Sequence, residues 1–293
     1  MFMGVTYQSK KIKTVEVSHF FRPSSRSPSL WSVQVGNVNL RQFNEVSLKD
    51  AVEELAKDAD EIKKIVRTIV NCEDPDVNCY PYHVAYGNNC GGVLLHNRWA
   101  LTAAHCGKNP HIRAGSKYAR EGKKVVIKNH YPHKLWMSVR NQHIFDFDYQ
   151  LLELNESLDF DENVAPLKIG HNDDIVPGKF VTVSGWGVKD RKGSHFEMLR
   201  GVLVPIIEER RCQESSTARH QGNLTSRMFC AGFEKGLRDA CHGDSGGSAV
   251  SNGRVLGLVS FGYGCAEPNS YGIYSNVALV RSWIEDITNL DLN

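Results

Sequence analysis

The spacing of apolar residues changes partway along the chain. In residues 47–67 the apolar side chains recur every three or four positions and share one helical stripe: Leu48, Val52, Leu55, Ala59, Ile62 and Val66. Ser47, with Asp50 three positions later, has the pattern of a helix N-cap. We predict an amphipathic helix over 47–67, with a coiled-coil seam as the less favoured alternative. Residues 1–46 mix Ser, Pro and basic side chains, which favours loose order.

After residue 69 the pattern changes to short apolar runs separated by turn residues. Four runs with strand character lie at 99–102, 123–128, 180–184 and 254–260. Short strands at this spacing are typical of an all-β sandwich or barrel. Near the end, apolar residues return to helical spacing at Val277, Val280, Ile284 and Ile287. This pattern predicts a terminal helix that packs one face onto the domain.

Composition is that of an ordinary soluble globular protein. The chain has 293 residues, of which 41% are hydrophobic and 23% are charged, so it has room for a sizeable core and roughly two structural units. The net charge is only +2, which gives no reason to expect a nucleic acid or an anionic membrane as partner. No apolar run reaches the roughly 18 residues that a transmembrane helix requires.

All 8 cysteines follow residue 70. They are Cys72, Cys79, Cys90, Cys106, Cys212, Cys230, Cys241 and Cys265. An even number without CxxC spacing argues against a structural zinc site and favours the disulfides of a mid-sized secreted domain. The glycosylation sequons at Asn155 and Asn223 point the same way. Residues 1–11 lack the apolar core of a signal peptide, so we expect the natural start to lie upstream.

Three short motifs carry the candidate chemistry, in the order His, Asp, Ser. His105 lies in Thr-Ala-Ala-His-Cys, Asp148 comes shortly before an apolar run, and Ser245 lies in Gly-Asp-Ser-Gly-Gly. A serine hydroxyl needs a base to take its proton as it attacks a carbonyl, and histidine suits that step. A buried carboxylate then orients the imidazole, while glycines let backbone N–H groups approach an oxyanion. Asp146 competes with Asp148 for the carboxylate role.

From Ile69 to the C-terminus the chain resembles the trypsin-like (chymotrypsin-fold) serine endopeptidases. The matching segments are Pro81-Tyr82-His83-Val84, Cys90-Gly91-Gly92, the run ending in His105-Cys106, Ser184-Gly185-Trp186-Gly187, the run from Cys241 to Gly247, and Ser260-Phe261-Gly262. The resemblance implies an all-β fold of two six-stranded antiparallel β-barrels packed together, with a C-terminal helix and the active site between the barrels. Residues 1–68 would be a partly helical N-terminal extension or pro-segment, and residues 69–293 the protease domain.

The resemblance also assigns roles to individual residues. It implies that His105 is the general base, Asp148 its orienting partner and Ser245 the nucleophile. Asp148 is favoured over Asp146 because it stands just before Leu151-Leu152, as the family's aspartate does. The N–H groups of Gly243 and Ser245 would form the oxyanion hole. The implied disulfides are Cys90–Cys106, Cys212–Cys230 and Cys241–Cys265, and Cys72 with Cys79 is expected to form an extra local bridge.

Substrate preference is implied by three further positions. Asp239 matches the base of the family's primary pocket, where a buried carboxylate selects Arg or Lys. Gly262 and Gly272 match pocket-wall positions at which small residues keep the slot open. Two departures from the family pattern, Phe261 in place of a usual Trp and His242 in place of a common Gln, are expected to change subsite preference without abolishing hydrolysis.

No cofactor is expected. The 12 histidines show no zinc-ligand spacing. Ser116 and Lys124 stand where calcium-binding relatives place acidic residues, so we predict no calcium site there. Tyr271 resembles an aromatic that in some relatives accompanies a sodium site, and it is also explained by packing alone.

Activation is the irregular feature of the sequence. In the family, cleavage frees an Ile-Val amino terminus whose ammonium pairs with the aspartate before the nucleophile, and Ile69 and Asp244 match these positions. The usual Gly-Gly after Ile-Val is Asn71-Cys72 here, and Thr68 separates Arg67 from Ile69. Cleavage after Arg67 would therefore leave a terminus one residue too long.

Together these features predict a secreted trypsin-like endoprotease, made as a zymogen, that cleaves after Arg or Lys through an acyl-enzyme. The alternative is a regulatory or binding homologue that does not activate because of its Thr68-Ile69-Val70-Asn71 junction. Expected partners are protein or peptide substrates and protein inhibitors, with no nucleic acid or membrane, and the chain is expected to be a monomer.

Overall fold

The computed structural model describes residues 80–138, 140, 143–188, 198–236 and 239–292, together with four strand backbones within the first 39 residues. The chain divides into two units, Met1–Asn71 and Cys72–Asn293. In the described part of the chain, no helix is both long and apolar enough to cross a bilayer. The helix predicted over 47–67 lies outside the described residues.

The first unit contains a small antiparallel sheet. Its strands, in the order β1-β2-β3-β4, are β1 (Gly4–Tyr7), β2 (Val15–Ser18), β3 (Ser32–Val35) and β4 (Val38–Asn39). The register places Val15 opposite Val35 and Val17 opposite Val33. The Ser, Pro and basic side chains of this region predict loose order, and the observed strands differ from that prediction. Their physical basis is the alternation of β-branched valines with polar residues in β2 and β3.

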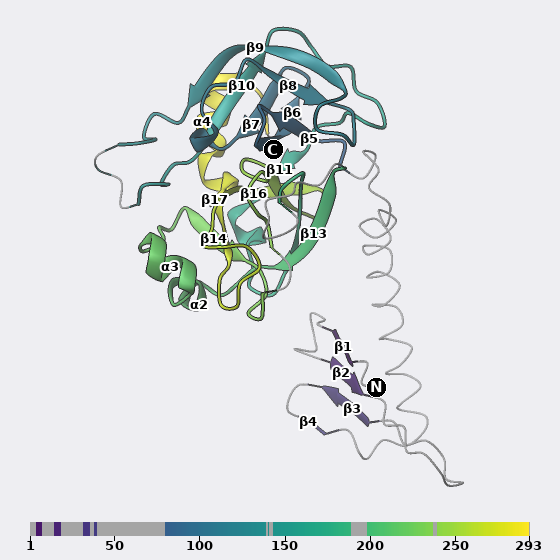
Figure 1. The fold of residues 1–293 in the computed structure, drawn as a ribbon, viewed down its shortest axis with the longest axis vertical. Helices are drawn as coiled ribbons and strands as arrows, with labels where there is room; N and C mark the ends of the chain where they lie inside the picture. Colours follow the sequence, from purple (N-terminus) through teal and green to yellow (C-terminus); the bar gives the residue numbers. More distant parts are fainter. Residues whose placement is uncertain are drawn as a thin grey trace. The chain divides into compact units, whose positions relative to one another are not determined.

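The second unit begins with a closed antiparallel barrel (Figure 1, blue to teal). The strand order is β10-β7-β6-β5-β8-β9, with bounds β5 (His83–Tyr86), β6 (Cys90–His96), β7 (Trp99–Thr102), β8 (His111–Ala114), β9 (Lys123–Pro132) and β10 (Gln150–Leu154). Apolar side chains from these strands fill its interior, among them the fully buried Val84, Leu94, Ile112, Val125 and Leu152. Closure pairs the edge strands and leaves no free edge.

A second curled sheet follows (Figure 1, teal through green to yellow). Its path is β13-β12-β15-β16-β17-β14, and β11 pairs in parallel with β16. The bounds are β11 (Lys168–Ile169), β12 (Phe180–Gly185), β13 (Arg200–Pro205), β14 (Met228–Ala231), β15 (Ser248–Ser251), β16 (Arg254–Phe261) and β17 (Gly272–Asn276). An isolated bridge between Ile206 and Ala231 connects the ends of the path. The predicted all-β, two-barrel fold is confirmed, and each of the four predicted strand runs lies within one of these strands.

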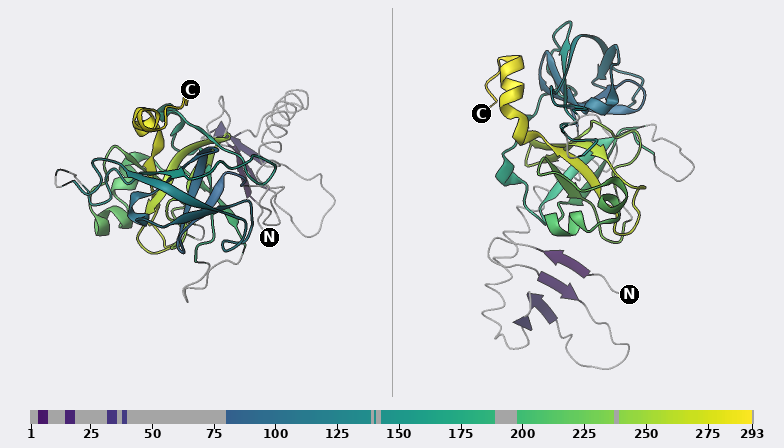
Figure 2. Two further views of the ribbon diagram at one scale, coloured as in Figure 1. Left: turned by 90° about the horizontal axis from the view of Figure 1, so that it is seen from above. Right: turned by 90° about the vertical axis from the view of Figure 1, so that its left-hand side faces the viewer.

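Short helices complete the unit. They are η2 (Ala104–Cys106), η3 (Asn172–Asp174), α2 (Glu209–Gln213), α3 (Ser216–Gln221), η4 (Val277–Val280) and α4 (Arg281–Thr288). The predicted terminal helix is confirmed as η4 and α4. Although α4 follows the second barrel in sequence, it lies beside the first barrel (Figure 2), where Trp283 contacts His133 with ring centroids 4.9 Å apart.

Three disulfides join the pairs that the family resemblance implies: Cys90–Cys106, Cys212–Cys230 and Cys241–Cys265. Each closes a short loop and, by restricting the unfolded chain, stabilises the fold by roughly 2–4 kcal/mol. Cys72 and Cys79 lie outside the described residues. A separate apolar cluster, which includes Leu151 of the first barrel and Leu258 of the second, joins the barrels and positions the residues between them.

Candidate active site

His105 lies at the point where the first barrel meets the second. The residue sits in η2, which begins two residues after the end of β7, and its ring is partly exposed. Its backbone N–H donates to Asp148 Oδ1 at 2.8 Å, and its Nδ1 lies 2.7 Å from Asp148 Oδ2. Because an ionised carboxylate can only accept, Nδ1 carries the proton of this contact. The other ring nitrogen, Nε2, is then the basic one.

Asp148 receives hydrogen bonds from both barrels. Its side chain is fully buried, and Ser260 Oγ of β16 donates to Oδ2 at 2.5 Å. A buried carboxylate is costly unless hydrogen bonds replace its water, and here His105 and Ser260 provide them. The resulting arrangement can hold an imidazole in one tautomer and stabilise it when it becomes charged.

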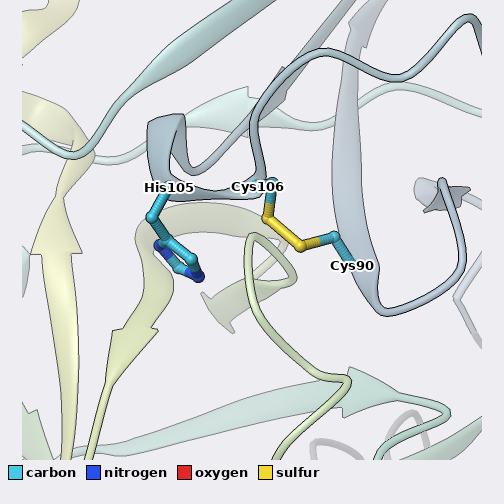
Figure 3. Close-up of side chains that lie close together, drawn as sticks. All are labelled: Cys90, His105 and Cys106. Atoms are coloured by element: carbon cyan, nitrogen blue, oxygen red, sulfur yellow. A yellow bond between two sulfur atoms is a disulfide. The ribbon is translucent and has the colours of Figure 1, made fainter.

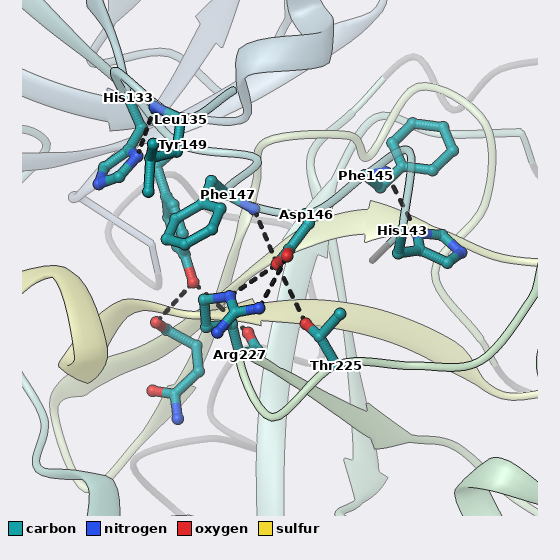
Figure 4. A network of polar contacts seen from close by, with 10 residues as sticks. His133, Leu135, His143, Phe145, Asp146, Phe147, Tyr149, Thr225 and Arg227 are labelled. Atoms are coloured by element: carbon teal, nitrogen blue, oxygen red, sulfur yellow. Dashed lines mark hydrogen bonds and ion pairs between the residues drawn. The ribbon is translucent and has the colours of Figure 1, made fainter. Parts of the chain in front are cut away.

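Asp146, the competing carboxylate, faces a different partner (Figure 4). Arg227 donates from Nε to Asp146 Oδ1 and from a terminal nitrogen to Oδ2, both at 2.7 Å. Thr225 Oγ1 adds a third bond at 3.1 Å. Since these bonds engage both carboxylate oxygens, Asp146 is the less suitable partner for His105.

Ser245 lies in a tight loop against the first barrel. Its carbonyl oxygen accepts a hydrogen bond from the Gly91 N–H at 2.7 Å and lies 3.7 Å from Cys106 Sγ. Cys106 directly follows His105, and Figure 3 shows the imidazole beside the Cys90–Cys106 disulfide. The loop therefore brings Ser245, from the second barrel, next to the segment that carries His105.

The same loop presents two backbone donors. Gly243 has a φ of +101°, which favours glycine. Neither Gly243 nor Ser245 donates its backbone N–H to any described residue, whereas Asp244, Gly246 and Gly247 all donate theirs within the second barrel. Two such N–H groups are suited to binding a developing oxyanion.

Gly246 lets this loop approach the first barrel closely. Its φ is +75°, and a Cβ there would lie 2.2 Å from Thr102 Oγ1 and 2.6 Å from the Gly91 carbonyl oxygen. Gly253 has a similar φ of +68°, yet a Cβ there would meet nothing within 4 Å. Both positions therefore carry the cost of a positive φ, but only Gly246 also has a neighbouring barrel in close contact.

We expect Gly246→Ala to lower the free energy of unfolding by about 2–5 kcal/mol, because a positive φ is strained and the neighbouring barrel must shift. Gly253→Ala, which changes only the conformational cost, should lower it by about 1–2 kcal/mol. Urea unfolding followed by circular dichroism measures both values. Equal losses in the two variants would show that the close approach of the loop has no energetic weight.

Asp239 provides a carboxylate in a desolvated position. Oδ2 accepts from the Ala266 N–H at 3.2 Å, while Oδ1 is buried without a hydrogen-bond partner among the described residues. Burial raises the pKa of Asp239 to about 7, although hydrogen bonds from the Ala266 and Ala240 backbone oppose the change. This is the electrostatic state of a group that lacks a counter-charge.

The two glycines predicted to line the pocket differ in their surroundings. A Cβ on Gly272 would lie 3.0 Å from Asp239 Oδ1 and 3.2 Å from the Tyr274 hydroxyl, so glycine keeps a side chain away from the carboxylate. Gly262 is exposed, and a Cβ there would meet only the Gly264 carbonyl oxygen, at 3.8 Å. The structure thus places Gly272, not Gly262, directly against Asp239.

Similarity to known proteins identifies the family of this chain. The Trypsin family model matches residues 69–284. The chain belongs to the trypsin family. It is 38% identical over 207 residues to Trypsin 5G1 of Aedes aegypti, covering 69% of this chain and 76% of that protein. It is 34% identical over 236 residues to a trypsin of Phaedon cochleariae (76% and 89% covered) and 32% identical over 228 residues to anionic trypsin of Canis lupus familiaris (73% and 85% covered).

Membership of the trypsin family confirms the predicted enzyme class. The chain is a serine endopeptidase, a hydrolase that acts on protein or peptide substrates.

An aromatic cluster beside His105 was not singled out from the sequence. The Phe145 ring meets the His105 ring edge-on, with centroids 5.7 Å apart, and stacks on Phe261 at 4.8 Å. The His143 ring also stacks on the Phe261 ring, with centroids 4.8 Å apart. The only signal in the sequence was the Phe-Asp-Phe-Asp run itself, which shows the aromatic residues but not what they contact.

Tyr274 is a second residue that sequence reasoning missed. It belongs to β17, and its hydroxyl is buried without a partner among the described residues, close to Asp239. Burial, with the nearby Asp239 and Asp244 charges, raises its pKa well above the usual value. The hydroxyl is therefore a neutral donor beside the pocket carboxylate.

The remaining predicted positions have ordinary surroundings. Tyr271 is fully buried in a cluster that includes Ile273 and the Cys212–Cys230 disulfide, so packing accounts for it. His242 is exposed. Cys90, His105 and Cys106 lie close enough together to suggest a metal site, but the disulfide uses both sulfurs and leaves only an imidazole nitrogen as a ligand.

Asp244 rests on the backbone of the second barrel. Its Oδ1 accepts from the Gly187 N–H and its Oδ2 from the Cys241 N–H, both at 2.8 Å. A Cβ on Gly185 would lie 1.9 Å from Oδ1, which explains why glycine occupies that position. Ile69, its predicted partner after activation, lies outside the described residues.

Proposed function

We propose that this trypsin-family chain cleaves peptide bonds after Arg or Lys and forms an acyl-enzyme at Ser245. The observation that carries the specificity is the Asp239 carboxylate, whose buried Oδ1 has no hydrogen-bond partner among the described residues. A guanidinium or ammonium group entering beside Gly272 would supply the missing counter-charge. An apolar side chain would leave the carboxylate uncompensated, which is the basis of the discrimination.

The proposed reaction begins with proton transfer. His105 Nε2 takes the proton of the Ser245 hydroxyl as Oγ bonds to the substrate carbonyl carbon. The N–H groups of Gly243 and Ser245 stabilise the oxyanion of the tetrahedral intermediate. His105 then gives the proton to the leaving nitrogen as the C–N bond breaks, and water releases the acyl group by the same steps. Asp148 stays ionised throughout.

Activation by cleavage before Ile69 is part of the proposal. In the continuous chain the Ile69 nitrogen is a peptide amide and carries no positive charge. Cleavage would create an ammonium that can pair with Asp244, whose carboxylate lies in the loop that carries Ser245. Such a buried pair would order the loop and the pocket.

Secretion is proposed on two grounds. Three disulfides join the described cysteines, and disulfides persist in oxidising compartments. The acceptor asparagines of both sequons, Asn155 and Asn223, are exposed, as a glycosylated surface residue must be.

The test of the proposed function uses the chain cleaved before Ile69. We expect this enzyme to hydrolyse an arginyl amide in preference to a phenylalanyl amide, and Ser245→Ala to abolish the activity. The amino terminus of the naturally occurring protein, read by sequencing, shows whether cleavage takes place at Ile69. Silence from the correctly cleaved wild-type chain would favour the regulatory homologue.

The pKa of Asp239 predicts a pH dependence for cation binding. Above about pH 7 the empty pocket holds a carboxylate, and the affinity for a small guanidinium ion should be constant. Below about pH 7 the cation must displace a proton, so its affinity should fall by up to about tenfold per pH unit. Calorimetric titration with ethylguanidinium measures this without relying on catalysis. Asp239→Asn should bind weakly at every pH, and a profile unchanged by that substitution would contradict the assignment.

A further inference from the structure

The segment from His143 to Tyr149, which carries Asp148, is attached to the second barrel at several residues. His143 Nε2 lies 2.8 Å from the Gln221 carbonyl oxygen, and the Phe145 ring stacks on Phe261. Tyr149 OH donates to the Asn276 carbonyl oxygen at 2.8 Å. These contacts flank Asp148 on both sides, although the segment itself belongs to the first barrel.

The strongest of these attachments is the ion pair between Asp146 and Arg227 (Figure 4). Asp146 is 1% exposed and Arg227 is 26% exposed. The two parallel bonds, at 2.7 Å each, fix distance and orientation together. The guanidinium also lies over the Phe147 ring, 4.5 Å from its centroid. Arg227 thus holds the two residues that immediately precede Asp148.

We propose that Asp146 and Arg227 form a positioning pair, which keeps Asp148 at a fixed position relative to the barrel that carries Ser245. The inference rests on the proposed function, because it concerns the geometry of that same site. Asp148 has to reach His105 in the first barrel and Ser260 in the second at the same time. The two bonds of the Asp146–Arg227 pair lie two residues from Asp148 and allow little movement of this segment along the second barrel. Apolar contacts alone would allow more movement.

A contribution to stability alone does not explain why these two buried residues are charged. Burying two charges costs desolvation energy, and replacement of such a pair by apolar residues often leaves stability unchanged or improved. What apolar residues cannot reproduce is the fixed orientation of the two bonds. Catalytic rates depend steeply on such geometry, since a displacement of about 1 Å can cost roughly 100-fold.

The test replaces both charges at once in the enzyme cleaved before Ile69. Asp146→Leu combined with Arg227→Met leaves no buried charge uncompensated, so the variant is expected to fold. We expect kcat per titrated active site to fall by roughly 10- to 100-fold, with the KM for a small arginyl amide unchanged. Arg227→Lys keeps the charge but loses the fork, and should lose several-fold less activity than the double variant.

Arg281→Met is the matched control. Arg281 donates to the Ile169 and Gly170 carbonyl oxygens and, among the described residues, makes no hydrogen bond to the segment that carries Asp148, so its loss should lower stability but leave kcat per active site unchanged. A double variant with wild-type kcat would overturn the inference. If the double variant does not fold, Arg227→Lys decides, and wild-type kcat there would overturn it. Failure of the proposed function is distinct, since the wild-type enzyme itself would then lack Ser245-dependent activity.

Discussion

Asp148→Asn, in the enzyme cleaved before Ile69, will lower kcat for an arginyl amide by about 10⁴-fold near neutral pH. An asparagine side chain can donate as well as accept, so it no longer requires the proton of His105 to reside on Nδ1. The tautomer with its proton on Nε2, which cannot act as base towards Ser245, then becomes populated. Steady-state kinetics with active-site titration measures the loss.

Asp146→Asn is the control for this prediction. It makes the same chemical change two residues away, at a carboxylate bonded to Arg227. We expect it to lose far less activity than Asp148→Asn. A larger loss at Asp146 would mean that the carboxylate role has been assigned to the wrong residue.

The second large effect concerns substrate choice. Asp239→Lys places a positive charge at the base of the pocket, and we expect kcat/KM for an arginyl amide to fall by at least about 10³-fold. The loss combines the missing counter-charge with repulsion of the substrate cation. Hydrolysis of a phenylalanyl amide should change much less, since it does not use the charge.

The ratio of kcat/KM for the two amides is the informative quantity. Asp239→Asn removes the charge without reversing it, and should lie between wild type and Asp239→Lys. If the variant with lysine still prefers arginine, another residue selects the substrate and the pocket assignment is wrong.

Local motifs were sufficient to predict the enzyme class, because the residue types that perform acyl transfer occur in short, distinctive runs. His105 and Ser245 each lie in such a run. The two-barrel fold followed from the same motifs through the family resemblance. Periodicity added the terminal helix, since Ile284 and its neighbours keep helical spacing.

The family resemblance favoured Asp148 over Asp146 from its place before Leu151-Leu152, but the partner of Asp146 could not be predicted from the local sequence. Both lie in one Phe-Asp-Phe-Asp run, and only tertiary structure brings Arg227, 81 residues away, against Asp146. The same limit applies to Tyr274, whose proximity to Asp239 arises from the packing of β17. Pattern reasoning also missed the strands in residues 4–39, because composition outweighed the valine alternation in β2 and β3.

The Asp148 carboxylate contacts both barrels, because it accepts a hydrogen bond from Ser260 of the second barrel as well as from His105 of the first. Each barrel has its own apolar interior. Heating that loosens the seam between the barrels would separate donor from acceptor while every strand remains paired. Thermal inactivation of this enzyme would then precede the melting of its sheets, and cooling would restore turnover as long as neither barrel had opened.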